Sequence, residues 1–491
     1  MGTIQRQGII NTVIIYIGVV FGFLNRMLIQ PHYLTPEEVG LSGLLIGFCG
    51  FLTVFFSLGA SSMCLRFFPS FKNKGRSHNG FLGFLLLFPL TGIIVGGIII
   101  LFLKSWLIST YAEKSPLFTD YFFWVLPLAA AMTLSIALNA YASSLFKTIV
   151  VSFLNDVWVR ICLIAFTFAY SFSWIDFDFF VAGIGLTYFS QVVFLLIYIQ
   201  RIDGLWLKIN WPFLYATIGL KNIFRFTGLM TLTAISTLSL RFLDTIMIGA
   251  YVSEKAVGVY AIGAFIAQFI ETPLNSLERI GGVKIAHAFE AKNMNEVRDI
   301  YYKSVRYLFL LGGFIGICII TCIYDLLKLL PVAYHDAATI AIIASIGSVF
   351  NMATGINTPI INNSSKYFWN LIFLSLLLVV AVVMNMFLIP RYGIVGAAIA
   401  TVIASSIFNL MKFVFIWKHF KLQPYDTQTL KTIFVIGLTG LVMLLIPGIQ
   451  NPWTAILVKG AVAAIIYTSL VYVFRIVPEY NKLIREKLYK L

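Results

Sequence analysis

Long apolar runs separated by short charged loops dominate this chain of 491 residues. Hydrophobic residues make up 60% of it and charged residues 11%, whereas a soluble protein carries about 25% charged residues. Runs of about 20 apolar residues have the length of a helix that crosses a bilayer. The pattern excludes a soluble enzyme, a secreted disulfide scaffold and a disordered chain.

Fourteen such runs lie between charge clusters and turns rich in proline, glycine and asparagine. The sequence therefore predicts an all-α polytopic membrane protein, and the thirteenth run is the shortest. The predicted spans lie near residues 9–29, 40–64, 81–103, 121–145, 151–171, 178–199, 227–250, 256–277, 306–327, 337–358, 368–389, 394–417, 431–447 and 455–475.

Lysine and arginine are divided unequally between the two sets of loops. One set, together with both ends of the chain, carries most of them, including those of the tail 478–491. The other set carries only Lys104, Lys114, Lys255, Lys328, Arg391 and Lys459. Because basic loops stay in the cytoplasm, both termini are predicted to be cytoplasmic, which requires an even number of spans. The basic residues that produce the net charge of +15 are therefore expected mainly at the inner membrane surface. No nucleic-acid partner is expected.

Other kinds of chemistry leave no mark on the sequence. The five cysteines (Cys49, Cys64, Cys162, Cys318 and Cys322) fall inside apolar runs and are predicted to be packing residues, not disulfides. We find no phosphate-binding loop, metal-ligand spacing or nucleophile motif. We expect no enzyme activity, no cofactor and no metal, so that an ion gradient, the membrane potential or the substrate gradient must supply energy.

An internal repeat links the two halves of the chain. The segment 33–40, Tyr-Leu-Thr-Pro-Glu-Glu-Val-Gly, matches the segment 251–258, Tyr-Val-Ser-Glu-Lys-Ala-Val-Gly, at an offset of 218 residues. Each copy joins an outgoing helix to a returning one. Thr35 and Glu38 are spaced as a capping box, and Ser253 supplies the corresponding cap in the second copy.

The repeat predicts a six-plus-six duplication with a pseudo-two-fold axis along the membrane normal. The expected domains are an N-lobe at 1–200, a cytoplasmic linker at 201–226 and a C-lobe at 227–417. Helices 13 and 14 and the tail follow at 418–491. Transporters built from such repeats bind substrate between the halves and rock around it.

Several segments resemble the polysaccharide-exporter branch of the multidrug/oligosaccharidyl-lipid/polysaccharide (MOP) superfamily. They are the turn 33–40, Leu-Gly-Ala-Ser-Ser at 58–62 with Leu-Arg-Phe-Phe at 65–68, Pro-Arg-Tyr-Gly-Ile-Val-Gly-Ala-Ala at 390–398, and the stretch 289–306, predicted to be an amphipathic helix on the inner leaflet. The resemblance implies a flippase of the bacterial inner membrane. Its cargo would be undecaprenyl-pyrophosphate-linked oligosaccharide, and membrane lipids, a polysaccharide polymerase or glycosyltransferases would be its other contacts.

Charged residues inside spans are expensive and therefore mark functional candidates. Arg26, Arg160 and Arg241 are the predicted substrate-binding residues, because guanidinium groups bind phosphate in a bidentate way. Arg26 and Arg241 would face each other from opposing lobes. The alternatives are that Arg26 extends to the outer surface and that Asp156–Arg160 and Arg241–Asp244 are structural pairs.

The acidic candidates are Asp156, Asp244 and Glu271, as paired acids or as sites that couple transport to H⁺ or Na⁺. Glu271 precedes Pro273, which is expected to break or kink the eighth helix. Lys412 lies near the inner end of the twelfth span. The alternative for Glu271 is a structural pair with a cation on another helix.

Three other functions compete with the polysaccharide flippase. A lipid II flippase and a multidrug or cation antiporter would use the same scaffold, although an antiporter of cations calls for an acidic cavity and usually twelve helices. An integral membrane glycosyltransferase, polymerase or ligase needs an acid or base held in a sizeable loop. The short outer loops argue against that class.

Overall fold

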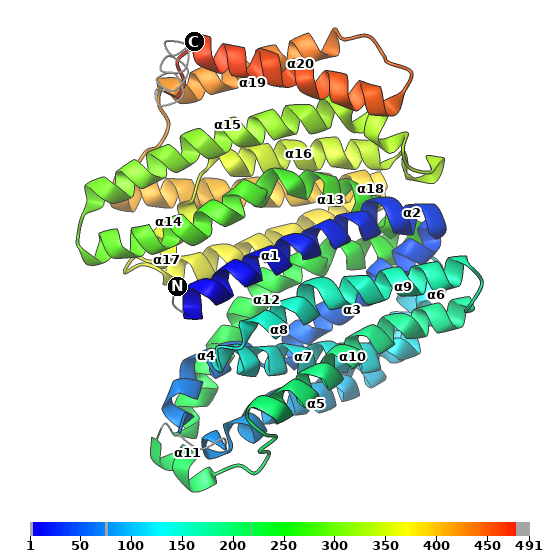
Figure 1. Cartoon of the computed structure of the whole chain (residues 1–491), viewed down its shortest axis with the longest axis vertical. Coiled ribbons are helices and arrows are strands. Elements are labelled where there is room, and N and C mark those ends of the chain that lie inside the picture. The colour runs from blue at the N-terminus through cyan, green and yellow to red at the C-terminus, as the bar shows by residue number, and fades with distance from the viewer. Residues whose placement is uncertain (1–2, 74–76, 218, 478–491) are drawn as a thin grey trace. The chain divides into compact units, whose positions relative to one another are not determined.

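The structure is a computed structural model that describes residues 3–73, 77–217 and 219–477, with side chains from residue 10 onward. The basic tail 478–491 lies outside the described residues. Every regular element in the described ranges is helical, as Figure 1 shows. The all-α prediction is therefore confirmed.

Thirteen helices among the described residues are long and apolar enough to cross a membrane. One of them, α18 (Phe368–Phe420), has 53 residues and contains a non-helical residue, Gly393, with φ 57° and ψ −136°. A helix of that length would measure about 80 Å, far more than the roughly 30 Å of a bilayer core. It therefore forms two spans that meet near Gly393, which gives fourteen crossings, as predicted.

By its own contacts the chain divides into two compact units, Met1–Gly258 (unit 1) and Val259–Leu491 (unit 2). The lobes expected from the repeat follow a duplication and not a contact boundary, and they stay a prediction. The helices of unit 1 are α1 (Thr3–Phe23), a π-helical segment (Leu24–Ile29), α2 (Gln30–Tyr33), α3 (Pro36–Phe56), α4 (Ala60–Phe71), α5 (Phe81–Tyr111), α6 (Pro116–Asp120), α7 (Val125–Ser144), α8 (Thr148–Ser152), a second π-helical segment (Phe153–Trp158), α9 (Val159–Ser171), α10 (Phe177–Ile202), α11 (Trp211–Thr217) and α12 (Leu220–Tyr251).

Helix α3 is the central helix of unit 1. It packs against α5, α7 and α12, while α1 packs against the second π-helical segment. Toward the inner ends of the spans, aromatic rings of Phe68, Phe81 and Tyr141 fill a core that is almost fully buried. This packing holds α1, α9, α10 and α12, which carry the polar residues described below, in one helical bundle.

Unit 2 holds the remaining helices and ends in an added pair. They are α13 (Glu254–Gln268, which begins in unit 1), a 3₁₀ turn (Phe269–Glu271), α14 (Thr272–Glu290), α15 (Met294–Leu327), α16 (Ala337–Ala353), α17 (Asn357–Asn362), α18, α19 (Thr427–Leu444) and α20 (Pro452–Val473). Helices α19 and α20 pack on each other and on α15.

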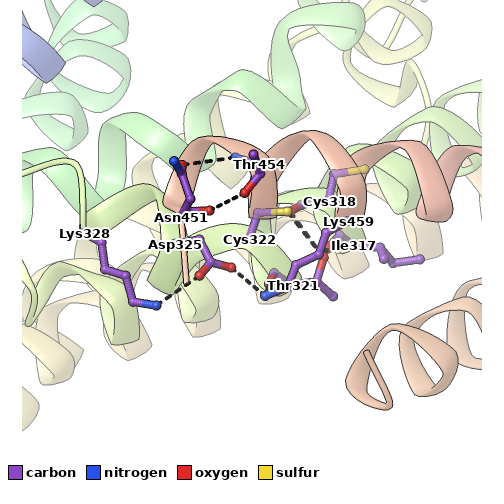
Figure 2. Close-up of polar contacts among 9 residues, drawn as sticks. All are labelled: Ile317, Cys318, Thr321, Cys322, Asp325, Lys328, Asn451, Thr454 and Lys459. Carbon is purple, nitrogen blue, oxygen red and sulfur yellow. Dashed lines mark hydrogen bonds and ion pairs between the residues drawn. The ribbon is translucent and has the colours of Figure 1, made fainter. Parts of the chain in front are cut away.

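Two ion pairs fasten the added helices to α15. Figure 2 shows the carboxylate of Asp325 on α15 between the ammonium groups of Lys459 on α20, at 2.5 Å, and Lys328, at 3.2 Å. Toward the other end of α15, Arg306 contacts Asp426, the N-cap of α19, at 2.9 Å. Apolar residues of α15, α19 and α20 form the core between these pairs.

Two predicted boundaries differ from the structure. Helix α12 begins at Leu220 and not near residue 227, because polar residues of its first turns continue the helix beyond the apolar run. The stretch 289–306 is not a separate surface helix, since residues from Met294 onward form the first turns of α15. Its apolar residues Val297, Tyr301 and Val305 are fully buried in the core of unit 2.

The outer turns and the cysteines behave as predicted. Thr35 and Glu38 form the complete capping box of α3, and the amide of Ala256 donates to Ser253 Oγ at 3.1 Å. All five cysteines are free.

Candidate functional site

Arg160 packs against a face of α1 that has glycine, Gly18 and Gly22, at the contact positions. Its guanidinium is 3.8 Å from the carboxylate of Asp156, one turn earlier, and also donates to the Asp156 carbonyl. A Cβ added at Gly22 would lie 2.9 Å from Arg160 Nε, and one at Gly18 would lie 2.5 Å from the Asp156 carbonyl oxygen. Only glycines at these two positions of α1 let the helix approach the pair so closely.

Arg26 follows on the same helix, one turn beyond Gly22. It belongs to the π-helical segment Leu24–Ile29, and such segments are frequent at functional sites. One of its terminal nitrogens lies 3.7 Å from the place of a Cβ at Gly43 on α3. Arg26 therefore reaches toward α3, near the outer end of that helix.

Arg241 lies on α12, which packs along α3. Its neighbour Phe242 packs on Gly50 of α3, and its guanidinium lies 6.0 Å from the Phe242 ring centroid. The hydroxyl of Tyr188 on α10 is within electrostatic range of both Arg160 and Arg241. We call Arg26, Arg160 and Arg241 the basic cluster.

The helices of Arg26 and Arg241 lie in one unit. Helices α1 and α12 both belong to unit 1, and α12 packs along α3; the assignment of the two arginines to opposing lobes follows the repeat and stays a prediction. Gly43 and Gly50 lie two turns apart on α3, or about 10 Å, so the two arginines are attached at different depths. The i, i+4 pair Asp156–Arg160 is present as the sequence predicts.

Amide side chains border the cluster. Asn139 on α7 and Gln191 on α10 both donate to the side-chain oxygen Oδ1 of Asn155, at 2.9 Å and 2.5 Å. Asn155 precedes Asp156 in the second π-helical segment. The interhelical hydrogen bonds therefore fix the segment that carries Asp156.

The repeated outer turns contact each other inside unit 1. A Cβ at Gly40 would overlap the Glu254 carbonyl oxygen, and one at Gly258 would lie 2.4 Å from the Pro36 carbonyl oxygen. These contacts are reciprocal, since Pro36 and Glu254, like Gly40 and Gly258, are 218 residues apart. A local two-fold axis between the two copies of the turn would produce reciprocal contacts of this kind.

A second charged group lies in unit 2. Glu271 ends the 3₁₀ turn before α14, and Pro273 stands in the first turn of that helix, which confirms the predicted break. Lys412 on α18 is within electrostatic range of both Glu271 and Glu278. Among the described residues, no group of three or more His, Cys, Asp or Glu side chains is placed to hold a metal.

Sequence reasoning missed Tyr188 and Glu278. Glu278 was assigned to an inner loop, but it lies on α14, seven residues after Glu271 and so on the same helical face. That spacing was the available signal. Nothing in the sequence separates Tyr188 from the other 22 tyrosines of the chain.

Solved structures with the same fold are transporters. A lipid II flippase, MurJ, in an inward closed conformation has a TM-score of 0.75 at 16% identity, over 97% of this chain and 100% of that one. An inward-facing multidrug resistance MATE family transporter of the MOP superfamily has a TM-score of 0.63 at 14% identity, over 83% and 96%.

A third similar structure is a MOP superfamily transporter from Pyrococcus furiosus, with a TM-score of 0.52 at 14% identity, over 84% of this chain and 95% of that one. No family model and no curated protein matches the sequence. The chain therefore has the polytopic fold of MOP superfamily transporters.

Proposed function

We propose that this protein is a flippase that moves undecaprenyl-pyrophosphate-linked oligosaccharide across the bacterial inner membrane by alternating access. The cargo would be an O-antigen, capsule or exopolysaccharide repeat unit. The observation that carries the proposal is the basic cluster, three arginines in the membrane-spanning helices of unit 1 of a chain with a MOP transporter fold. Two of them, Arg160 and Arg241, act on the same tyrosine, Tyr188.

The chemistry of the cluster suits a pyrophosphate. A pyrophosphate crossing an apolar barrier needs fixed cations, and guanidinium donates two parallel hydrogen bonds to phosphate oxygens. The carboxylate of Asp156 faces Arg160 and Asp244 stands three residues after Arg241, so two carboxylates accompany three guanidinium groups. The amides of Asn139 and Gln191 show that polar donors lie in the same region, and sugar hydroxyls are partners for such groups.

Lipid II is the second candidate cargo. The similarity to the lipid II flippase covers 97% of this chain, whereas the multidrug transporter covers 83%. Lipid II carries the same pyrophosphate on the same polyprenyl chain, so the basic cluster suits both cargoes. A cation antiporter is disfavoured, because a cluster of arginines repels cations.

The experiment begins with Arg26→Ala and Arg241→Ala in the native host. Each should abolish surface glycan while the amount of protein in the membrane stays normal. Arg26→Lys and Arg241→Lys are the matched controls. Lysine keeps the positive charge but cannot donate the two parallel hydrogen bonds of a guanidinium group, so we expect partial activity from both. Unchanged glycan in both alanine variants would remove the cluster from the mechanism.

A reconstituted assay separates the two cargoes. Proteoliposomes that hold the purified protein are loaded with undecaprenyl-pyrophosphate oligosaccharide or with lipid II, and the arrival of each in the opposite leaflet is followed. We expect faster flipping of the oligosaccharide lipid. Flipping of lipid II alone would assign the protein to peptidoglycan synthesis. Elongation or transfer of glycan without partners would show an enzyme instead.

A further inference from the structure

Lys412 is a buried cation in unit 2 that the binding of a pyrophosphate does not use. It is 3% exposed and lies eight residues, or about 12 Å, before the end of α18. Burying an ammonium group costs several kcal/mol unless partners compensate. Its surroundings therefore determine what it can do.

Thr358 joins Lys412 to a carboxyl group. The ammonium donates to Thr358 Oγ1 at 3.2 Å, and the carboxyl of Glu278 interacts with both Lys412 and the Thr358 side chain. Lysine, threonine and glutamate come from α18, α17 and α14, and α17 packs on both of the other helices. The hydroxyl accepts from one side and can donate to the other, which makes it a bridge.

The charged groups around this bridge are few. Glu271 acts on both Glu278 and Lys412, and α17 contributes the amide of Asn357 and Thr358 itself. On its own helix Lys412 meets the ring of Phe408, 4.0 Å from the ring centroid. Asn409, one turn away on that helix, donates to Asn351 of α16 at 2.9 Å.

Asn357 is a buried amide next to the Thr358 hydroxyl. It is 1% exposed, and its side-chain nitrogen has no hydrogen-bond partner. Its oxygen lies 3.3 Å from the Thr358 hydroxyl. Because a hydroxyl has one proton, Thr358 can donate to only one acceptor at a time, either Asn357, as it does in this structure, or Glu278.

We infer that Lys412, Thr358 and Glu278 form a proton-transfer site that couples the proposed transport to a proton gradient. In the transfer step an N–H bond of Lys412 breaks and its proton binds Thr358 Oγ1. The hydroxyl proton of Thr358 passes to a Glu278 oxygen, where a new O–H bond forms. The ammonium–carboxylate pair becomes an amine and a carboxylic acid, with no change in total charge.

The proton can then leave through Glu278, which is only half-buried, while Lys412 is enclosed. The neutral amine is ready to accept another proton. Sodium is not needed, because the ammonium already supplies a cation beside Glu271 and Glu278. The inference rests on the proposed flippase function only for what the proton drives.

Infrared difference spectroscopy of the purified full-length chain tests the site without any cargo. On acid titration, the wild type should show a protonated-carboxyl band that is missing from Glu278→Gln, beside the bands that the other carboxyl groups give in both proteins. Thr358→Val should shift the midpoint of this band by about one pH unit, and Thr358→Ser, which restores the hydroxyl, should return it. Identical carboxyl bands in the wild type and Glu278→Gln, or equal midpoints in the wild type and Thr358→Val, would overturn the inference.

Two further measurements complete the test. Exchange of KCl for NaCl should leave the midpoint unchanged, and a shift would identify a sodium site instead. In proteoliposomes with undecaprenyl-pyrophosphate oligosaccharide, a pH gradient should accelerate the wild type and Thr358→Ser but not Thr358→Val. If the infrared result holds while no variant flips the lipid, the proton site stands and the proposed function fails.

Discussion

Charge is arranged in opposite ways in the two units. In unit 1 the basic cluster places three arginines in membrane-spanning helices, with Asp156 facing Arg160 and Asp244 three residues after Arg241. In unit 2 a single lysine, Lys412, lies within range of two carboxyl groups, Glu271 and Glu278. An anionic cargo is favoured by the first arrangement, and an exchangeable proton by the second. The comparison indicates that the two charged groups serve different purposes in the proposed function.

The residue types fit this division. Arginine stays charged at any physiological pH, so the basic cluster is a permanent set of cations. Lysine can lose its proton when it is buried, and glutamate can gain one. Arginine is therefore the expected side chain for binding phosphate, and lysine is the expected side chain for exchanging protons.

Charge reversal in the basic cluster is the change with the largest expected effect. Arg241→Glu would place a carboxylate where we propose that the cargo phosphate binds. It should slow flipping by at least about 100-fold, because a hydrogen bond to a charged group is worth about 1.5–3 kcal/mol and repulsion adds to its loss. The measurement is the flipping rate in proteoliposomes. The control is Arg225→Glu on the same helix, an exposed position outside the cluster, which should keep most of the rate.

Equal losses in the two variants would break the comparison between the units. They would show that α12 tolerates no added carboxylate, and the basic cluster would lose its special role. A retained rate in Arg241→Glu would have the same consequence.

The helices were predictable from the sequence because the length of an apolar run is a local property. Fourteen crossings, the capping box at Thr35 and the break before Pro273 all follow from neighbouring residues. The start of α12 was not predictable from hydropathy, because its first turns carry exposed polar residues such as Lys221 and Arg225. The π-helical segment with Asp156 is held by hydrogen bonds from Asn139 and Gln191, which lie on other helices.

The candidate site was predictable only in part. A charge inside a span is visible in the sequence, and Arg26, Arg160 and Arg241 were found in this way. Their grouping in unit 1 was not, because it depends on the packing of α12 along α3. Glu278 was missed because hydropathy assigned its helix to a loop, although the seven-residue spacing from Glu271 was available.

A third charged group sharpens the comparison, since Asp325 and Lys459 are expected to hold helices and not to take part in transport. Asp325 is 4% exposed and contacts Lys459 of α20 and Lys328. Lys459→Met should lower the free energy of unfolding by about 2 kcal/mol, because the carboxylate loses its better-buried partner. The flipping rate of the folded protein should stay unchanged.

Lys328→Met is the matched control for that pair. Its side chain is half exposed, so its loss should cost less than about 1 kcal/mol. Thermal unfolding of the purified variants gives the order. A larger loss in Lys328→Met, or a slower flipping rate in Lys459→Met, would contradict the purely structural role.

The smallest expected effect concerns Asp426, the cap of α19. Burial raises the pKa of its carboxyl, but hydrogen bonds from the Thr429 amide and from Arg306 outweigh burial and hold the pKa below its usual value. A lowered folded-state pKa means that this stabilisation is present above the unfolded value of about 3.9 and is lost as the pH falls through the folded pKa. Both side chains are about a third exposed, so the pair should contribute less than about 1 kcal/mol. Asp426→Asn keeps a capping oxygen and removes the charge. The unfolding midpoint of the variant should therefore fall less than that of the wild type between about pH 7 and about pH 3, and equal falls would show that the pair with Arg306 does not help to hold α19 on α15.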